Sequence, residues 1–280
     1  MRFSIITPSF QPGPWLRLAI ASVADQAGVE AEHLVQDGGS DDGTLDWVRE
    51  DRRVRVFVEK DAGMYDAINR GLRHASGDIL AYLNCDEQYL PGALARVAQF
   101  FATHPEVDVL FGDALLVDKL GRALSYRRII PPYALHTRLD HLGTLSCAMF
   151  FRRRLVAEGF LFPEASTAIG DAVFVWTLLT AGKRMASLDE MLATFTFTGN
   201  NLGQSGRAIQ EAQRWREGVW GWRAARPLVV LHHRFRKWRE KAYRYRDVGY
   251  SIYTAQSPSR RVQFQALRLG WQWPNSVAST

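Results

Sequence analysis

Apolar and polar residues along the first 113 positions follow two alternating periods. Runs of five or six mostly apolar residues, such as Phe3–Thr7 and Val107–Phe111, predict strands. Between such runs, apolar residues recur every three or four positions, which predicts helices. The predicted strands are 3–7, 32–36, 54–59, 78–83 and 107–111, and the predicted helices are 15–23, 44–48 (capped by Asp42 or Thr44), 66–74 and 91–104. This alternation predicts an α/β domain whose mostly parallel, Rossmann-like sheet is flanked by helices.

The rest of the chain divides at a change in composition. Up to residue 206 the pattern is less regular, with a predicted strand at Ser146–Phe151 and a predicted helix at Asp171–Ala181. After Gly206 arginine and tryptophan accumulate. We therefore predict two halves of one domain, 1–113 and 114–206, followed by a basic, Trp-rich helical extension, 207–280.

Composition bounds the class of protein. Hydrophobic residues make up 47% of the chain and charged residues 23%, which is typical of a soluble globular protein. Apolar runs stay far below the ~20 residues that span a bilayer. The start, Met1–Ile6, leads directly into a strand, so we expect no signal peptide. Two cysteines, Cys85 and Cys147, make no disulfide framework and suit a reducing cytosol.

Acidic residues gather where the predicted strands end. Asp37, Asp61, Asp86 and Asp113 each follow a strand-like run, and Glu87 follows Asp86 directly. Ligands of open α/β sheets bind at the carboxyl ends of the strands. Carboxylates there suit Mg²⁺ or Mn²⁺, with substrate phosphates and water as the other ligands. The alternative for each single acid is a solvated turn.

Several motifs, in order, are familiar from a known family. They are Ser4–Phe10, Ala21–Gln26, Gln36–Thr44, Glu59–Gly71, Ala75–Asp78, Asn84–Glu87, Phe150–Arg153 and Gly170–Asp171. Together they resemble family 2 glycosyltransferases over roughly residues 1 to 200. The resemblance implies a GT-A fold, with 1–113 as the nucleotide-sugar-binding half and 114–206 as the acceptor-binding half. It also implies an inverting transfer of sugar that requires Mn²⁺ or Mg²⁺.

The same resemblance implies a role for each matching residue. Nucleotide binding would use Thr7, Pro8, Ser9, Asp37 (at the base) and Asp61 (near the nucleoside), the metal would bind Asp86 and Glu87, and Asp171 would be the catalytic base. The chemistry is consistent, because a metal stabilises charge on the leaving diphosphate and a carboxylate takes the proton of the acceptor hydroxyl.

The chain departs from the family at two places. Glu87 replaces the usual second Asp of the metal motif, and Val173 replaces an acid that often follows the base by two residues. Asp171 has an alternative role as the N-cap of its helix. His136 and His141 lie where the acceptor half should begin, and we interpret them as surface or acceptor-loop histidines.

The basic extension allows three interpretations. Between Arg207 and Arg246, twelve lysines and arginines stand against three glutamates, interleaved with Trp, Leu and Phe. Such a helix binds an anionic membrane surface in its plane. Alternatively it packs its aromatic residues on the catalytic domain, or binds nucleic acid, which we regard as the least favoured interpretation.

The sequence therefore predicts a metal-dependent inverting glycosyltransferase. We expect a nucleotide-diphospho-sugar donor and a saccharide acceptor, lipid-linked by family analogy, in cell-surface polysaccharide or glycan assembly. The expected location is cytoplasmic, with peripheral attachment to the inner membrane through 207–246. The alternatives are a non-catalytic nucleotide-binding or scaffolding member of the fold, and a nucleotidyltransferase, which usually needs a basic glycine-rich loop that residues 8–14 lack.

Overall fold

The strands and helices of the first half lie close to their predicted positions. The computed structural model describes residues 1–199, 201 and 206–274, so residues 275–280 of the predicted extension lie outside the described residues. The first half contains β1 (Arg2–Ser9), α1 (Trp15–Ala24), β2 (Glu30–Asp37), α2 (Thr44–Val48), β3 (Arg55–Val58), α3 (Met64–His74), β4 (Ile79–Tyr82), β5 (Glu87–Tyr89) and α4 (Ala93–Thr103). The N-cap of α2 is Gly43 and makes no side-chain cap, while Asp42 accepts a hydrogen bond from the Thr44 amide at 3.1 Å.

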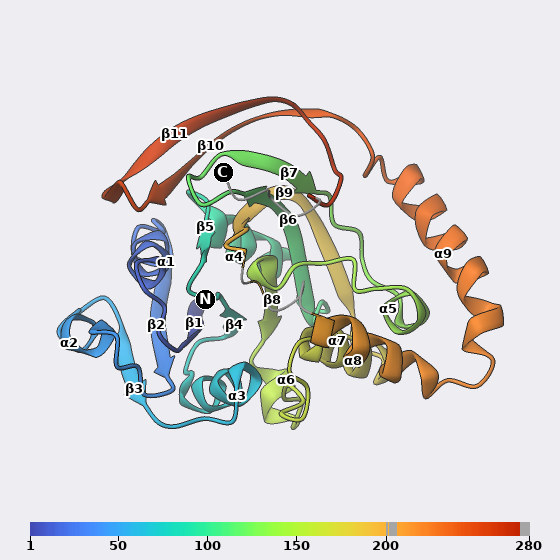
Figure 1. Cartoon of the computed structure of the whole chain (residues 1–280), viewed down its shortest axis with the longest axis horizontal. Helices are drawn as coiled ribbons and strands as arrows, with labels where there is room; N and C mark the ends of the chain where they lie inside the picture. The colour runs from blue at the N-terminus through green and yellow to red at the C-terminus, as the bar shows by residue number, and fades with distance from the viewer. Residues whose placement is uncertain (200, 202–205, 275–280) are drawn as a thin grey trace.

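The second half adds strands to the same sheet. It contains β6 (Val109–Val117), β7 (Ala123–Arg127), α5 (Ala134–Leu139), the 3₁₀ turn η1 (Ser146–Ala148), β8 (Met149–Arg152), α6 (Arg154–Ala157), α7 (Gly170–Thr180) and β9 (Met185–Thr196). The described strands run in the order β3-β2-β1-β4-β8-β6-β9-β5, and β7 pairs with β6. Most of the paired residues belong to the parallel pairs β1–β2, β2–β3, β1–β4 and β6–β9. The fold is therefore the predicted α/β fold with a mostly parallel sheet flanked by helices (Figure 1).

Helices cover both faces of the sheet because the central strands are apolar on both. In β1, Phe3 and Ile5 pack into a cluster that includes α4 residues, whereas Ile6 packs with residues of α3 and α7. All three side chains are fully buried. Burial of each contributes roughly 1.5–3 kcal/mol relative to exposure. This rigid double-faced core fixes the strand ends from which the acidic residues extend.

The C-terminal extension begins with helices and ends in a hairpin. Helices α8 (Gly206–Glu217) and α9 (Trp222–Arg239) precede β10 (Arg246–Thr254) and β11 (Ser257–Leu269), which pair with each other in antiparallel fashion. The hairpin lies along the top of the domain in Figure 1. The prediction of a wholly helical extension is therefore wrong from residue 246 onward. Val248, Tyr250 and Ile252 alternate with polar or small residues at the period of a strand.

The hairpin packs on the α/β domain. Tyr250 and Ile252 are buried in one cluster with residues of β6 and β7. The Arg261 guanidinium donates to both carboxylate oxygens of Asp25, at 2.5 and 2.7 Å, directly after α1. Gln88 exchanges two hydrogen bonds of 2.9 Å with the backbone of Tyr253. These contacts join the hairpin to the first half of the domain, although it lies at the other end of the chain.

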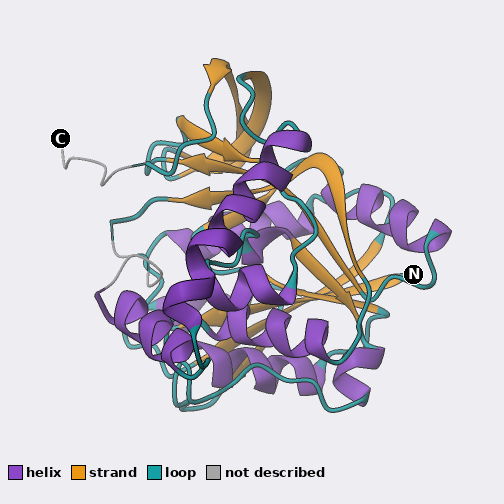
Figure 2. Ribbon diagram, turned by 90° about the vertical axis from the view of Figure 1, so that its right-hand side faces the viewer, coloured by secondary structure: helices purple, strands orange, loops and turns teal. Residues whose placement is uncertain are grey.

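Helix α9 crosses the side of the molecule that faces the viewer in Figure 2. Its buried residues are Val229, His233, Arg236 and Lys237. Arg236 donates to the Pro131 carbonyl at 3.0 Å, and His136 of α5 stacks on His233 with ring centroids 4.6 Å apart. His136 is buried by these contacts, so its interpretation as a surface histidine is wrong.

Candidate active site

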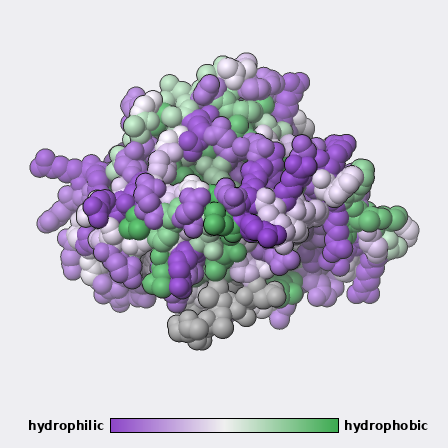
Figure 3. All heavy atoms as spheres, turned by 90° about the horizontal axis from the view of Figure 1, so that it is seen from above, coloured by the Kyte–Doolittle hydropathy of each residue, from purple (hydrophilic) through white to green (hydrophobic). Residues whose placement is uncertain are grey.

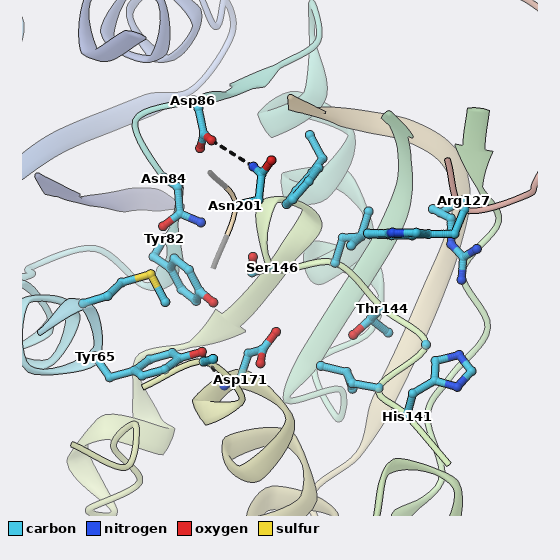
Figure 4. Close-up of a pocket in the computed structure, with 17 residues that line it drawn as sticks. Tyr65, Tyr82, Asn84, Asp86, Arg127, His141, Thr144, Ser146, Asp171 and Asn201 are labelled. Carbon is cyan, nitrogen blue, oxygen red and sulfur yellow. Dashed lines mark hydrogen bonds between the residues drawn. The ribbon is translucent and has the colours of Figure 1, made fainter. Parts of the chain in front are cut away.

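One cleft of about 510 Å³ brings together residues from both halves of the domain. Figure 4 shows Asp86 on one side of it, Arg127 and His141 on the other, and Asp171 between them. The side chains come from the ends of β4, β7 and β9, the loop after α5, and the N-termini of α3 and α7. Residues that line the cleft include Tyr65, Asn84, Asp86, Arg127, His141, Gly143, Asp171, Asn201 and Trp273.

Asp86 lies in the cleft as the motif predicts. It follows β4 by four residues and accepts a hydrogen bond of 3.2 Å from the Asn201 amide nitrogen. Burial raises the pKa of Asp86 to about 6. Loss of hydration disfavours the charged form, and no described cation forms an ion pair with it. A buried carboxylate without a cation is suited to bind a divalent metal ion.

Glu87 points away from the cleft. Its side chain is fully buried, and one carboxylate oxygen accepts a hydrogen bond from the Asn84 amide at 2.8 Å. The other oxygen, Oε1, has no hydrogen-bond partner among the residues that the structure describes. Burial and then the charge of Asp86 raise the pKa of Glu87 to about 8. In this arrangement Glu87 stabilises the loop that carries Asp86, and its predicted role as a metal ligand remains a prediction.

Asp171 lies in the first turn of α7, with its carboxylate at the cleft. The N-cap position belongs to Ile169, so the alternative of Asp171 as N-cap is wrong. One carboxylate oxygen accepts a hydrogen bond from the Ala172 amide at 2.8 Å, and burial raises the pKa of Asp171 to about 6. Val173, in place of a second acid, leaves Asp171 as the only carboxylate of this helix at the cleft.

Tyr65 positions this turn, and the sequence alone assigned it no role. Its hydroxyl accepts a hydrogen bond from the Asp171 amide at 3.2 Å. Its ring lies 2.6 Å from the place that a Cβ would occupy at Gly170, closer than real Cβ contacts allow. Glycine at 170 therefore permits α7 to begin directly against the tyrosine.

Four of the residues predicted for the nucleotide lie at the carboxyl ends of the paired strands β1 and β2. Asp37 is fully buried, and its oxygens accept four hydrogen bonds, from the Ser9 and Ser40 hydroxyls and from the amides of Gly39 and Ser40, at 2.7 to 2.9 Å. Thr7 Oγ1 lies 2.8 Å from His33 Nε2, and Pro8 accepts the Cys85 thiol at 3.3 Å. Thr7, Ser9 and Asp37 are buried and Pro8 is half-buried, and the predicted nucleotide contacts of all four remain predictions.

Asp61 lies against Gly38, the residue that follows β2. One of its carboxylate oxygens is 2.8 Å from the place that a Cβ would occupy at Gly38, and the other accepts a hydrogen bond from the Gly63 amide at 2.9 Å. Burial raises the pKa of Asp61. The exposed ring of Phe10 lies beside the same glycine. Gly38, Asp61 and Phe10 thus form a surface on which a nucleobase could stack.

The comparison with known families decides the identity of this fold. A model described as glycosyl transferase family 2 matches residues 4–160, more than half of the chain. The chain belongs to this family. The predicted resemblance is thereby confirmed, and residues of both 1–113 and 114–206 line the cleft of this family 2 chain.

Two curated relatives of this family 2 chain carry names that refer to the biosynthesis of PGL/p-HBAD and of teichuronic acid. A PGL/p-HBAD biosynthesis glycosyltransferase of Mycobacterium bovis is 36% identical over 120 residues, which cover 41% of this chain and 47% of that protein. The chain thus spans about half the length of that relative. The putative teichuronic acid biosynthesis glycosyltransferase TuaG of Bacillus subtilis is 24% identical over 242 residues, 84% of this chain and 91% of that protein.

Solved structures show the same GT-A fold. Residues 1–349 of S. aureus TarS in complex with UDP-GlcNAc superpose with a TM-score of 0.63 at 23% identity, over 76% of this chain and 65% of that one. The mannosyltransferase PcManGT from Pyrobaculum calidifontis, in complex with GDP-Man and Mn²⁺, gives 0.56 at 16% identity, over 82% and 73%. At this identity the likeness establishes the fold alone.

Two further features of the family 2 chain bear on its surroundings. Among the described residues, none of the helices combines the length and the apolar character required to cross a bilayer. Asp140, His141 and His233 form a cluster whose possible ligand atoms lie within 4.8 Å of one another. Only tertiary structure brings them together, because His233 comes from α9 and the other two follow α5.

Proposed function

We propose that this family 2 enzyme transfers a sugar from a nucleotide-diphospho-sugar to a saccharide acceptor with inversion of the anomeric centre. One observation carries the proposal. Asp86 and Asp171 line a single cleft from different halves of the domain. A donor held at Asp86 would present its anomeric carbon to an acceptor hydroxyl beside Asp171.

The residues at Asp86 fit a divalent metal ion. Asp86 offers a buried carboxylate with a raised pKa, and Mg²⁺ or Mn²⁺ usually binds one or two carboxylates together with substrate phosphates and water. Such an ion, when bound, would stabilise the charge that develops on the leaving diphosphate. Glu87 would hold the loop of Asp86 in place, and Asn201 would orient the carboxylate.

Asp171 would act as the general base. A base works best when its pKa lies near the working pH, and burial raises the pKa of Asp171 to about 6. Tyr65 would keep the turn in place through its hydrogen bond to the Asp171 amide. One base and one displacement give inversion.

A non-catalytic nucleotide-binding or scaffolding protein is the alternative. Two carboxylates with raised pKa values in one cleft favour an enzyme, because such groups cost stability unless they serve binding or catalysis. A panel of UDP-, GDP- and dTDP-sugars, with Mn²⁺ and Mg²⁺, tests the choice through binding and slow donor hydrolysis. Binding of a nucleotide sugar without hydrolysis or transfer under any condition would favour the scaffold.

The acceptor is expected to be lipid-linked, and α9 offers a surface for the membrane. Leu228, Leu231, Phe235 and Trp238 recur every three or four residues and are 53 to 71% exposed. Figure 3 shows apolar side chains at the end of the molecule where α9 lies. We call these four residues the outer stripe. Helix α9 contains no Asp or Glu, and exposed arginines lie beside the stripe.

An anionic lipid surface fits this helix better than a second copy of the chain. A basic helix with an apolar stripe lies in the plane of an anionic bilayer. Two copies in contact through α9 would bring like charges together. The proposed location is thus peripheral, at the cytoplasmic leaflet of the inner membrane. Trp215 illustrates the packing alternative, because it contacts Trp176 with ring centroids 5.9 Å apart.

Vesicle binding tests the outer stripe. Phe235→Asp together with Trp238→Asp should reduce sedimentation with phosphatidylglycerol-containing vesicles by about tenfold or more, since apolar burial at the interface is lost. Leu267→Asp is the matched control, because Leu267 is equally exposed, at 72%, but lies on β11. Equal binding of the double variant and the control would remove the membrane assignment.

A further inference from the structure

The side of the cleft opposite Asp86 carries positive charge. Arg127, at the end of β7, and His141, after α5, line this side (Figure 4). Lys237 of α9 lies behind them, with its Nζ 3.3 Å from His141 Nε2. The same Nζ is 3.7 Å from the place that a Cβ would occupy at Gly143, which also lines the cleft. Three separate elements thus bring cationic or proton-donating side chains to one place.

The charges of Arg127 and Lys237 are not neutralised within the described part of the chain. Arg127 donates to the Trp271 carbonyl at 3.2 Å and lies near the Trp273 ring, and neither it nor Lys237 forms an ion pair there with a carboxylate. Burial, followed by the charge of Arg127, lowers the pKa of Lys237 to about 8. Buried cations cost free energy unless an anion pairs with them.

The nearest carboxylate already has partners. Asp140 accepts from His233 Nδ1 at 2.9 Å and from His141 Nδ1 at 3.1 Å. His141 thereby turns its other nitrogen, Nε2, towards Lys237. Asp140 therefore orients the two imidazoles and leaves the positive charge at the cleft in excess.

A metal ion at Asp140, His141 and His233 is the competing assignment. The three residues are close enough to share one ion. Such an ion would lie beside the Lys237 ammonium, which is in contact with His141, and close to Arg127. Since two fixed cations repel a divalent cation and attract an anion, the local charge favours an anionic ligand.

We propose that Arg127, His141 and Lys237 form a subsite for an anionic group, a phosphate or phosphodiester, carried by the saccharide acceptor. The inference rests on the proposed glycosyl transfer and specifies its acceptor. Guanidinium and ammonium groups donate several hydrogen bonds to phosphate oxygens. Asp171 lies between this subsite and Asp86 in Figure 4, where the reacting hydroxyl of an acceptor would be expected.

The test is a binding experiment with the donor site filled. The full chain, saturated with UDP and Mn²⁺, is titrated with glucose 1-phosphate and with methyl glucoside, the neutral counterpart. The phosphorylated sugar should bind at least about tenfold more tightly, since charge-assisted hydrogen bonds are lost with the neutral one. Equal affinities would overturn the proposal.

Variants locate the effect. Arg127→Gln and Lys237→Met should each weaken glucose 1-phosphate binding by about tenfold and leave methyl glucoside unchanged. Arg214→Gln is the matched control, because Arg214 is exposed on α8, away from the cleft. UDP affinity reports correct folding, and if Lys237→Met does not fold, Arg127→Gln alone decides.

Two other outcomes would assign these residues to the donor diphosphate or to a metal ion. If Arg127→Gln weakens UDP binding as strongly as glucose 1-phosphate binding, the subsite belongs to the donor diphosphate and the acceptor assignment is wrong. Tight Zn²⁺ binding that His233→Ala abolishes, without phosphate binding, would make the cluster a metal site. None of these measurements needs turnover, so an absence of transfer would refute the proposed function without touching this result.

Discussion

The two sides of the cleft differ in charge and in origin. The side with Asp86 is acidic and comes from consecutive segments after β4, so its residues are neighbours in sequence. The side with Arg127, His141 and Lys237 is basic and is assembled from β7, the loop after α5, and α9. The acidic side offers the carboxylate proposed to hold a metal ion, whereas the basic side offers the groups proposed to recognise an anion, and Asp171, the proposed base, comes from α7. We infer that chemistry and acceptor selection are divided between them.

The largest effect should come from Asp171→Asn. If Asp171 is the base, kcat for transfer should fall by about 10²–10⁴-fold, because the amide cannot accept the proton. UDP affinity should change little, since Asp171 lies apart from the predicted nucleotide residues. Steady-state kinetics with parallel UDP titration measures both. A kcat close to that of the unmodified enzyme would show that Asp171 is not the base. It would also contradict the proposed division of chemistry and acceptor selection between the two sides of the cleft.

Removal of the metal should come next. Excess chelator, or Asp86→Asn, should reduce transfer by about 10²-fold or more, because the charge on the leaving diphosphate loses its counter-charge. Mn²⁺ should restore the chelated enzyme but not the variant. The control is Asp118→Asn, because Asp118 is paired with Arg122 away from the cleft. Full activity in chelator would contradict the role of Asp86.

The pH profile should sharpen the comparison further. Because burial raises the pKa of Asp171 to about 6, the fraction of ionised base falls below that pH. We therefore expect kcat to fall about tenfold per pH unit below pH 6 at saturating donor and acceptor. A kcat profile that is flat between pH 5 and pH 7 would argue against this base. A fall of kcat/KM for the acceptor above about pH 8 would report loss of the Lys237 charge on the basic side.

Glu87→Gln should have the smallest effect on transfer. With a pKa raised to about 8, Glu87 is largely protonated near neutral pH, and glutamine has nearly the same shape. A carboxyl whose pKa is raised in the folded state contributes stability at low pH that is lost as pH rises from about 4.5 to 8. Thermal melting across this range should therefore show a flatter pH dependence in the variant. A tenfold loss of transfer would instead support Glu87 as a metal ligand.

Particular segments show how much of the fold could be predicted from the sequence. The run from β1 to β6 was predicted nearly in full, because period-two and period-3.6 patterns there coincide with burial in a two-faced core. The hairpin at 246–269 was missed, although Val262, Phe264 and Ala266 alternate as a strand should. The prediction of a helical extension rested on its charge and tryptophan content. The strand structure of β11 depends instead on pairing with β10 and on burial against β7.

At the site, too, features that depend on local motifs were predicted, and features that depend on distant contacts were not. The sequence by itself determined the family, the order of the strands along the chain and the positions of Asp86 and Asp171, since each depends on residues close together in the chain. Only the tertiary structure decided that Glu87 faces the interior, that Tyr65 supports Asp171, and that Lys237 lies beside His141. The last two outcomes depend on which surfaces meet across 96 or more residues of chain, and burial, not local pattern, sets that choice.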